Sequence, residues 1–318
     1  MNPPQPRIAL VVPCYNEAVA IGTVLDEYKA AWPEMALHVF DNNSTDGTAD
    51  VARAHGAQVT QVQFQGKGNV VRRMLADVDA DVYVMVDGDA TYDASALREH
   101  VNLLITENLD MVLGQRIDDH AEADTNYRRG HRLGNRALTG TVMWIFGGSF
   151  ADMLSGYRVF SRRFAKSFAA HAHGFETETE LTVHALEQRM PCREVPVTYR
   201  SRPDGSVSKL STYRDGWRIL RTIVKLTSTE RPLTFFGMIA ALLALVSVGI
   251  AIPLFSTYFA TGLVPRMPTA MLSTGLMLSA MLSMLCGVLL HQVTLARREA
   301  KHLAYLQVPP PGALRKPT

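Results

Sequence analysis

Short apolar runs alternate with amphipathic segments along the N-terminal two thirds of the chain. Runs at 8–12, 37–40, 59–62, 82–86 and 111–113 are rich in β-branched residues and are followed by polar or turn-forming residues, which predicts buried strands. Between them, apolar residues recur at helical spacing, as in Ile21, Val24, Leu25 and Tyr28. Because strands that alternate with helices form βαβ units, the pattern predicts an α/β domain with a mainly parallel sheet.

The pattern changes after this alternation. An acidic loop is predicted at 118–124 and a helix at 127–145 that begins with several arginines. A further strand ending at Phe160, a helix after Gly174, a last strand at 195–199 and a polar loop at 201–211 complete the predicted domain, which we place at residues 1–210.

Two long stretches, 233–255 and 269–295, contain no charged residue. Each is long enough to cross a hydrocarbon core of about 30 Å. Basic residues flank both outer ends of this 231–296 region and only Arg266 lies in the connecting loop, so the positive-inside rule places both flanks in the cytoplasm. We therefore predict a multi-pass protein of the inner (cytoplasmic) membrane with its main domain in the cytoplasm. Close helix packing is expected at small residues, namely Ser247, Gly249, Gly275, Ser279, Ser283 and Gly287.

Two segments flank the predicted membrane hairpin. Residues 211–230 form a basic amphipathic helix with a stripe of Arg214, Arg218, Arg221 and Lys225. Such a helix either lies on anionic lipid or packs on its own domain. Residues 297–318 are predicted to be a disordered cytoplasmic tail.

Composition narrows the class further. The net charge is +2, and no feature indicates a nucleic-acid partner. Cys14, Cys192 and Cys286 follow no metal or redox spacing, which fits a reducing compartment. The N-terminal residues lack the apolar segment of a signal peptide. A homo-oligomer is left open.

Polar clusters follow three of the predicted strands, around Tyr15, Asp41 and Asp87. Because the carboxyl ends of parallel strands meet at one edge of a sheet, a shared site is expected there. Asp87 and Asp89 could offer hard oxygen ligands to Mg²⁺ or Mn²⁺, although Asp and Gly after a strand also form ordinary solvated turns.

Four motifs in order resemble the family 2 glycosyltransferases with the GT-A fold: 13–17 (PCYNE), 41–48 (DNNSTDGT), 66–69 (GKGN) and 87–89 (DGD). The later segments 155–158 (SGYR) and 205–210 (GSVSKL), with the membrane hairpin, are similar to the polyprenyl-phosphate branch, the dolichol-phosphate mannosyltransferase and polyisoprenyl-phosphate glycosyltransferase group. The resemblance implies a Rossmann-like nucleotide-sugar domain plus a C-terminal two-helix transmembrane hairpin.

The resemblance also implies roles for residues. The nucleotide-sugar donor would contact Pro13, Tyr15, Asn16, Glu17, Asp41, Asn43, Lys67, Asp87 and Gly88. Asp87 and Asp89 would hold Mg²⁺ or Mn²⁺. Some relatives carry a glutamine ligand two residues beyond the second aspartate, where this chain has Thr91, which leaves the coordination to be completed by water.

The implied acceptor is a polyprenyl phosphate. A phosphate monoester is largely dianionic at neutral pH, so it needs positive charge more than a base. Candidate groups are Arg116, Arg128, Arg132 and Lys209, and each could instead be an ordinary surface ion-pair partner. Asp152 could orient the acceptor, act as a base or simply shape a turn.

The sequence thus predicts an inverting, metal-dependent enzyme that moves one sugar from a nucleotide donor to polyprenyl phosphate at the cytoplasmic leaflet. Two alternatives remain at this point. One is a membrane glycosyltransferase acting on a lipid hydroxyl or polysaccharide acceptor. The other is a catalytically silent membrane scaffold that keeps the fold.

Overall fold

The computed structural model of the chain describes residues 6–118, 139–169, 174, 176–201, 221, 224–225 and 227–314. The chain divides into two compact units. The first comprises Met1–Trp217 together with Ala300–Thr318, and the second comprises Arg218–Glu299. Residues 119–138 and 202–220, which include much of the predicted basic helix at 127–145 and of the predicted amphipathic helix, lie outside the described residues.

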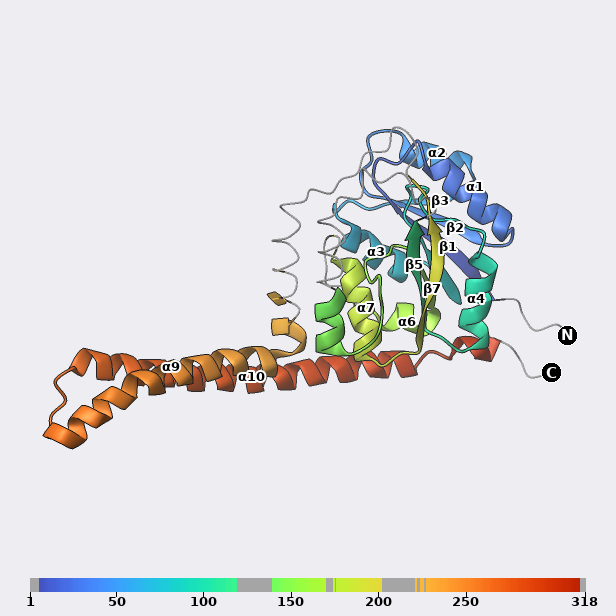
Figure 1. The fold of residues 1–318 in the computed structure, drawn as a ribbon. Coiled ribbons are helices and arrows are strands. Elements are labelled where there is room, and N and C mark those ends of the chain that lie inside the picture. Colours follow the sequence, from blue (N-terminus) through green and yellow to red (C-terminus); the bar gives the residue numbers. More distant parts are fainter. Residues whose placement is uncertain are drawn as a thin grey trace. The chain divides into compact units, whose positions relative to one another are not determined.

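A seven-stranded sheet forms the centre of the first unit (Figure 1), with the strand order β3-β2-β1-β4-β6-β5-β7. Its strands are β1 (Ile8–Cys14), β2 (Ala36–Asp41), β3 (Gln58–Gln61), β4 (Val82–Met85), β5 (Met111–Asp118), β6 (Arg158–Ser161) and β7 (Cys192–Tyr199). β6 pairs antiparallel with both of its neighbours, β4 and β5. The other strand pairs are parallel, so the prediction of a mainly parallel sheet is confirmed.

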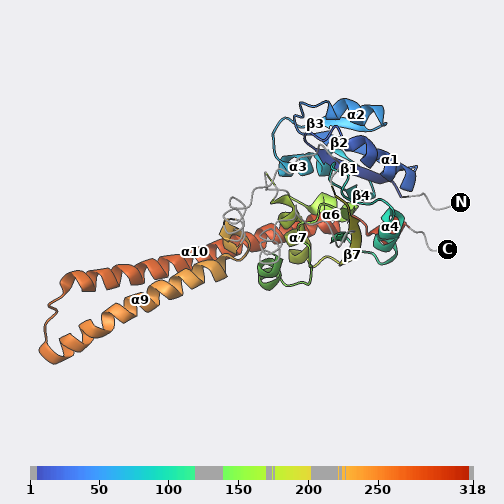
Figure 2. The same cartoon turned by 45° about the horizontal axis from the view of Figure 1, so that its top comes forward.

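Helices cover both faces of this sheet (Figures 1 and 2). One face packs against α1 (Ile21–Ala31), α2 (Thr48–Ala54) and α4 (Leu97–Thr106). The other packs against α3 (Lys67–Asp77), α6 (Arg162–Ser167) and α7 (Thr177–Glu187). The two faces follow from strand geometry, because successive side chains point to opposite sides.

Strand β1 shows this alternation clearly. Leu10 and Val12 belong to the core on the α1 side, whereas Ala9 and Val11 belong to the core on the α3 side. All four side chains are at most 1% exposed. A strand that is buried on both faces reads as a continuous apolar run in the sequence, and the sequence of β1 has that form.

The second unit contains helix α9 (Pro232–Thr261) and most of α10 (Met267–Leu306), which lie side by side as a hairpin (Figure 2). Both helices are long and apolar enough to cross a membrane, and only 11% and 17% of the most apolar window of each is buried within the protein. α9 begins at a proline and ends before Gly262, whose φ of 69° is left-handed, as is common at helix C-termini.

Small residues join the two helices. The hydroxyl of Ser247 donates to the carbonyl of Ser273 at 2.8 Å, and the hydroxyl of Ser273 donates to the carbonyl of Ser247 at 3.0 Å. Gly287 packs so closely that a Cβ there would lie 3.0 Å from the Cβ of Phe236. Gly249 and Gly275, which we also expected at the helix contact, have open space around them.

The prediction of a disordered tail is wrong for its first part. Residues up to Leu306 continue α10, and a short 3₁₀ helix, η1 (Pro311–Leu314), follows. Tyr305 donates to Asp110 at 2.8 Å, and the backbone N–H of Gly312 donates to Asn108 at 2.8 Å. The segment after Glu299 is therefore a packed part of the first unit, held by hydrogen bonds that composition does not reveal.

Candidate active site

The carboxyl ends of β1, β2 and β4 gather acidic side chains around Cys14. In the register of the parallel pair, Cys14 lies opposite Asp41, and β4 leads directly into Asp87 and Asp89. Burial raises the pKa of the Cys14 thiol, and the negative charges of Glu17, Asp41, Asp87 and Asp89 raise it further. These carboxylates therefore share one edge of the sheet, where ligands bind in open α/β folds.

Asn16 and Asn43, two of the predicted donor residues, lie on the loops after β1 and β2, which hydrogen-bond to each other. The backbone N–H of Asn16 donates to Ser44 Oγ at 2.9 Å, and that of Thr45 donates to Asn16 Oδ1 at 2.8 Å. Asn43 donates its side-chain amide to the carbonyl of Gln63 at 2.8 Å. The side chains of Asn16 and Asn43 thus hold the loops in place.

Asp41 and Tyr15 are presented differently. Asp41 is 1% exposed, and one carboxylate oxygen accepts from the backbone N–H of Ser44 at 3.2 Å. Its other oxygen has no hydrogen-bond partner among the described residues. Tyr15 is 36% exposed, and the adjacent Pro13 and Glu17 are half-buried. The sheet edge therefore offers an aromatic ring, a proline and buried carboxylate oxygens.

Sequence reasoning missed Asn42, the buried residue between two predicted donor residues. Its side-chain amide donates to the carbonyls of Val62 and Phe64 at 3.0 and 2.9 Å. Its oxygen accepts from the backbone N–H of Gly66 at 2.6 Å. Asn42 thereby fixes the loop that leads into α3 and its first residue, Lys67. The only sequence signal was the run of polar residues after a strand.

Lys67 lies between two carboxylates. Its ammonium is 2.5 Å from Asp87 Oδ1 and 2.5 Å from Glu178 Oε1. Glu178 is in the first turn of α7 and its side chain is 5% exposed. The sequence pattern indicates Lys67 and Asp87, whereas the contact with Glu178 is found only in the structure.

Asp89 is 5% exposed, and Thr91 holds it: the Thr91 hydroxyl donates to Asp89 Oδ1 at 2.6 Å. Between them Ala90 adopts a left-handed backbone with φ of 57°. Gly88 is needed because a Cβ there would lie 2.6 Å from Cys14 Sγ. The turn is therefore a fixed structure that directs two carboxylates to the sheet edge.

A divalent ion fits the chemistry of this turn. Asp87 and Asp89 supply hard oxygens. Gly156 lies so close to Asp87 that a Cβ there would overlap its carboxylate, so only glycine leaves room for Asp87 at this position. Within the described ranges, no three His, Cys, Asp or Glu side chains are grouped so as to hold a metal ion by themselves. Mg²⁺ and Mn²⁺ sites commonly use one or two carboxylates plus phosphate oxygens, so two aspartates are sufficient.

Arg116 and Asp152 form a two-pronged ion pair. Nε of Arg116 is 2.6 Å from Asp152 Oδ2, and its NH2 nitrogen is 2.8 Å from Oδ1. Glu194 of β7, which sequence reasoning missed, accepts the backbone N–H groups of Ala151 and Asp152, each at 2.8 Å. The guanidinium of Arg116 also lies 5.5 Å from the centre of the Tyr199 ring. The structure therefore fixes Arg116 at the end of β5.

The 155–158 motif has a structural centre in Arg158, whose side chain is completely buried. It donates to the carbonyls of Met153, Ser155 and Glu178, and to the hydroxyl of Thr182. Burial lowers its pKa to about 10, so the group remains charged at neutral pH. Arg158 thus ties the loop carrying Asp152 to the helix carrying Glu178. The other predicted acceptor residues, Arg128, Arg132 and Lys209, lie outside the described residues.

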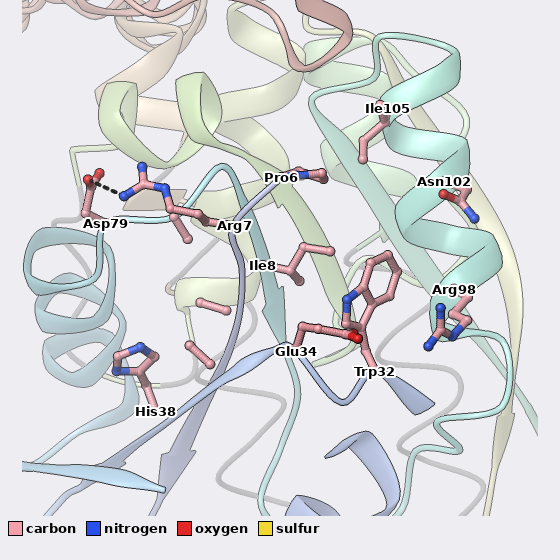
Figure 3. A pocket seen from close by; sticks show the side chains of 13 residues that line it. Pro6, Arg7, Ile8, Trp32, Glu34, His38, Asp79, Arg98, Asn102 and Ile105 are labelled. Carbon is pink, nitrogen blue, oxygen red and sulfur yellow. Dashed lines mark hydrogen bonds and ion pairs between the residues drawn. The ribbon is translucent and has the colours of Figure 1, made fainter. Parts of the chain in front are cut away.

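A separate cavity of about 660 Å³ lies elsewhere in the first unit (Figure 3). Its lining includes Ile8 and Ala36, the first residues of β1 and β2, together with Trp32 and Arg98. It therefore opens at the edge of the sheet opposite the acid cluster and takes no part in the candidate active site.

The mainly parallel sheet with helices on both faces, and acid residues at the carboxyl ends of its strands, has the GT-A fold. The model of glycosyl transferase family 2 matches residues 9–168, about half of the chain. The chain belongs to glycosyl transferase family 2, and it is a glycosyltransferase.

Several named proteins are similar to this chain. Glycosyltransferase AglJ of Haloferax volcanii is 34% identical over 257 residues, covering 80% of this chain and 83% of AglJ. A dolichyl-phosphate hexose transferase of the same organism is 30% identical over 224 residues, covering 70% of this chain and 95% of that protein. Among solved structures, glucosyl-3-phosphoglycerate synthase from Mycobacterium tuberculosis, in complex with Mn²⁺, uridine diphosphate and glucosyl-3-phosphoglycerate, matches with a TM-score of 0.57 and 23% identity. That match covers 70% of this chain and 80% of the synthase, and it shows a shared fold.

Proposed function

We propose that this protein transfers one sugar, with inversion at the anomeric carbon, from a nucleotide-sugar donor to a polyprenyl phosphate. The observation that carries the proposal is the acid cluster around Cys14 in a family 2 domain whose chain also has two membrane-length apolar helices. The similarity to a dolichyl-phosphate hexose transferase over 95% of its length supports a phosphorylated lipid as acceptor. The reaction then takes place at the cytoplasmic leaflet of the inner membrane.

The donor nucleoside binds across the ends of β1 and β2. Tyr15 and Pro13 offer an exposed ring and an apolar edge for the base. Carboxylates only accept hydrogen bonds, so Glu17 and Asp41 suit N–H groups of a base or ribose hydroxyls. The buried, unpartnered oxygen of Asp41 supports this role, because it can accept such a bond without first losing another one.

The donor diphosphate lies beside Asp87, Asp89 and Lys67. These two aspartates would hold Mg²⁺ or Mn²⁺, which when bound offsets the negative charge of the departing nucleoside diphosphate. Thr91 fixes Asp89 by its hydrogen bond at 2.6 Å, and Lys67 adds a further positive charge next to Asp87.

The acceptor phosphate lies toward Arg116. A phosphate oxygen forms the new bond to the anomeric carbon while the bond from that carbon to the diphosphate oxygen breaks on the opposite face. Because the acceptor is already an anion, no proton has to be removed. We therefore assign Asp152 to positioning Arg116 through their paired contacts rather than to base catalysis. Arg128, Arg132 and Lys209 remain predicted acceptor residues.

The proposal is tested by a screen of sugar donors combined with removal of the metal ion. Full-length protein in detergent is incubated with undecaprenyl phosphate and a panel of nucleotide sugars, and lipid-linked sugar is measured by mass spectrometry. Product is expected with one donor or a few related donors, its loss with excess chelator, and its recovery with Mn²⁺ or Mg²⁺. Absence of product with every donor, or product formation unaffected by chelator, would contradict the proposal.

A further inference from the structure

The ion pairs around Lys67 raise a question of charge. The ammonium of Lys67, whose side chain is 11% exposed, contacts Asp87 and Glu178 at 2.5 Å each. Lys67 is therefore a cation held between two anions. One of these anions, Asp87, is also a proposed ligand of the divalent ion.

Glu178 is not explained by folding alone. Its side chain is 5% exposed, and its Oε2 atom has no hydrogen-bond partner in the part of the chain that the structure describes. Leaving a buried polar atom unpaired destabilises the fold, and more so when the group is charged. The backbone around it is nevertheless well fixed, because the carbonyl of Glu178 accepts bonds from Arg158 and Thr182 at 3.0 Å each.

Ion binding changes the balance at Asp87. Without an ion, Asp87 Oδ1 is paired with the Lys67 ammonium. A divalent ion on Asp87 would compete with that ammonium for the carboxylate and repel it, because two like charges a few ångströms apart interact strongly in a site with little water. Unless another anion holds Lys67, its positive charge would be driven away from the place where the donor diphosphate binds.

We propose that Glu178 is a positioning residue that retains the Lys67 ammonium beside the diphosphate when a divalent ion takes over Asp87. This inference rests on the proposed function of Asp87. Lys67 exchanges one of its two partners: Asp87 passes to the ion, Glu178 stays, and a freed N–H of the ammonium turns to a phosphate oxygen. The positive ion then binds to the negative Asp87, and the negative diphosphate binds to the positive Lys67.

The exchange predicts opposite effects of two substitutions on Mn²⁺ binding in the absence of nucleotide. In Glu178→Gln, Lys67 has only Asp87 as an anionic partner, so Mn²⁺ should bind about tenfold more weakly, the equivalent of one charge-assisted hydrogen bond. In Lys67→Met, the competing cation is gone, so Mn²⁺ should bind more tightly while uridine diphosphate binds more weakly. If Lys67 and Glu178 had only structural roles, the two substitutions would not change the affinity for Mn²⁺ in opposite directions.

The test is a titration of the full-length protein with Mn²⁺, following the electron paramagnetic resonance signal of the free ion. The decisive comparison is a double-substitution cycle. The effect of Glu178→Gln should disappear in the Lys67→Met background, because Glu178 acts through Lys67. An equal effect in both backgrounds, or none in either, would overturn the inference. Glu180→Gln, in the same first turn of α7, is the matched control and should leave Mn²⁺ binding unchanged.

The outcomes separate this inference from the proposed function. Mn²⁺ titration requires neither acceptor nor sugar transfer. Wild-type protein that binds Mn²⁺ but shows no response to Glu178→Gln overturns only the role of Glu178. Wild-type protein that binds no Mn²⁺, with or without uridine diphosphate, overturns the metal site itself and with it both proposals. Lys67→Met supplies an independent reading if Glu178→Gln folds poorly, and unchanged Mn²⁺ binding there also counts against the exchange.

Discussion

Two buried carboxylates at opposite edges of the same sheet differ in how completely they are hydrogen-bonded. Asp110, just before β5, is 0% exposed, and its oxygens accept from Ser161, from two nitrogens of Arg163 and from the hydroxyl of Tyr305. Glu178, near the other edge, has Lys67 on one oxygen and no described hydrogen-bond partner on the other. The first carboxylate is fully satisfied by the fold, and the second is left incomplete.

The difference between the two carboxylates indicates which part of the fold is available to bind a ligand. A buried charge that is completely paired contributes to a unique structure, and breaking one of its pairs is costly. A buried charge with a vacant acceptor position destabilises the protein until a ligand or a neighbouring ion compensates it. Asp41, with an unpartnered oxygen at the end of β2, belongs to the second kind, and it lies in the acid cluster around Cys14.

The largest expected effect concerns the acid cluster. Asp89→Asn should reduce the rate of sugar transfer about a thousandfold, because losing a ligand to the ion withdraws several kcal/mol of charge stabilisation. The melting temperature should change little. The rate is measured from lipid-linked product by mass spectrometry, with Asp79→Asn as the matched control because Asp79 is 54% exposed and pairs with Arg7 and Arg162 at the surface. Equal rates for Asp89→Asn and wild type would place the chemistry elsewhere.

The second effect concerns stability at the opposite edge. Asp110→Asn should lower the free energy of unfolding by about 3 kcal/mol, because it removes the negative charge of a fully buried carboxylate that pairs with the partly buried guanidinium of Arg163. Chemical denaturation of the first unit measures this, and the rate of sugar transfer below the melting temperature should stay near that of wild type. If Asp110→Asn kept its stability but lost sugar transfer, Asp110 would have a functional role rather than a structural one.

A smaller effect depends on pH. Burial lowers the pKa of His184 to about 3, below its usual value of 6.5, and the ring bonds to Ser167 between Phe164 and Phe168. The unfolded chain therefore binds a proton that the folded chain does not, and stability falls as pH drops below 6.5. Between pH 6.5 and pH 5 the loss should be about 2 kcal/mol. Denaturation at both pH values should show this loss in wild type and a much smaller one in His184→Asn.

The smallest effect removes one bond from the satisfied carboxylate. Tyr305→Phe deletes the hydrogen bond of 2.8 Å to Asp110 and should cost about 1 kcal/mol. The ring contact with the guanidinium of Arg163, at 4.7 Å, is kept. Thermal unfolding measures the change, and Tyr258→Phe, on the exposed surface of α9, is the matched control. No change in melting temperature would show that the contact of the last turns of α10 with Asp110 contributes nothing to stability.

The sequence predicted what depends on local pattern. Alternating apolar runs predicted the sheet, and the strand that leads into Asp87 and Asp89 was found because burial on both faces makes its sequence continuously apolar. Two long uncharged stretches predicted the helices α9 and α10, although both helices extend beyond the predicted ends.

Contacts between distant residues could not be predicted in this way. Glu194 supports Asp152 from 42 positions away, and Lys67 meets Glu178 across two helices. No periodicity encodes such pairs, because each depends on the three-dimensional course of the chain. The prediction of a disordered C-terminal segment was wrong for a related reason. The proline-rich composition of the segment indicates disorder, whereas Tyr305 and Gly312 form hydrogen bonds with Asp110 and Asn108.

The most direct test of the central claim is a comparison of acceptors. Wild-type protein receives the preferred nucleotide sugar with either undecaprenyl phosphate or undecaprenol, and initial rates of lipid glycosylation are measured by mass spectrometry. The proposed site provides positive charge at Arg116, and in this account no residue acts as a general base. A hydroxyl acceptor needs such a base, which contributes at least about a hundredfold to the rate. The phosphate should therefore react at least about a hundredfold faster. Comparable rates with the two acceptors, or transfer to the alcohol alone, would contradict the account.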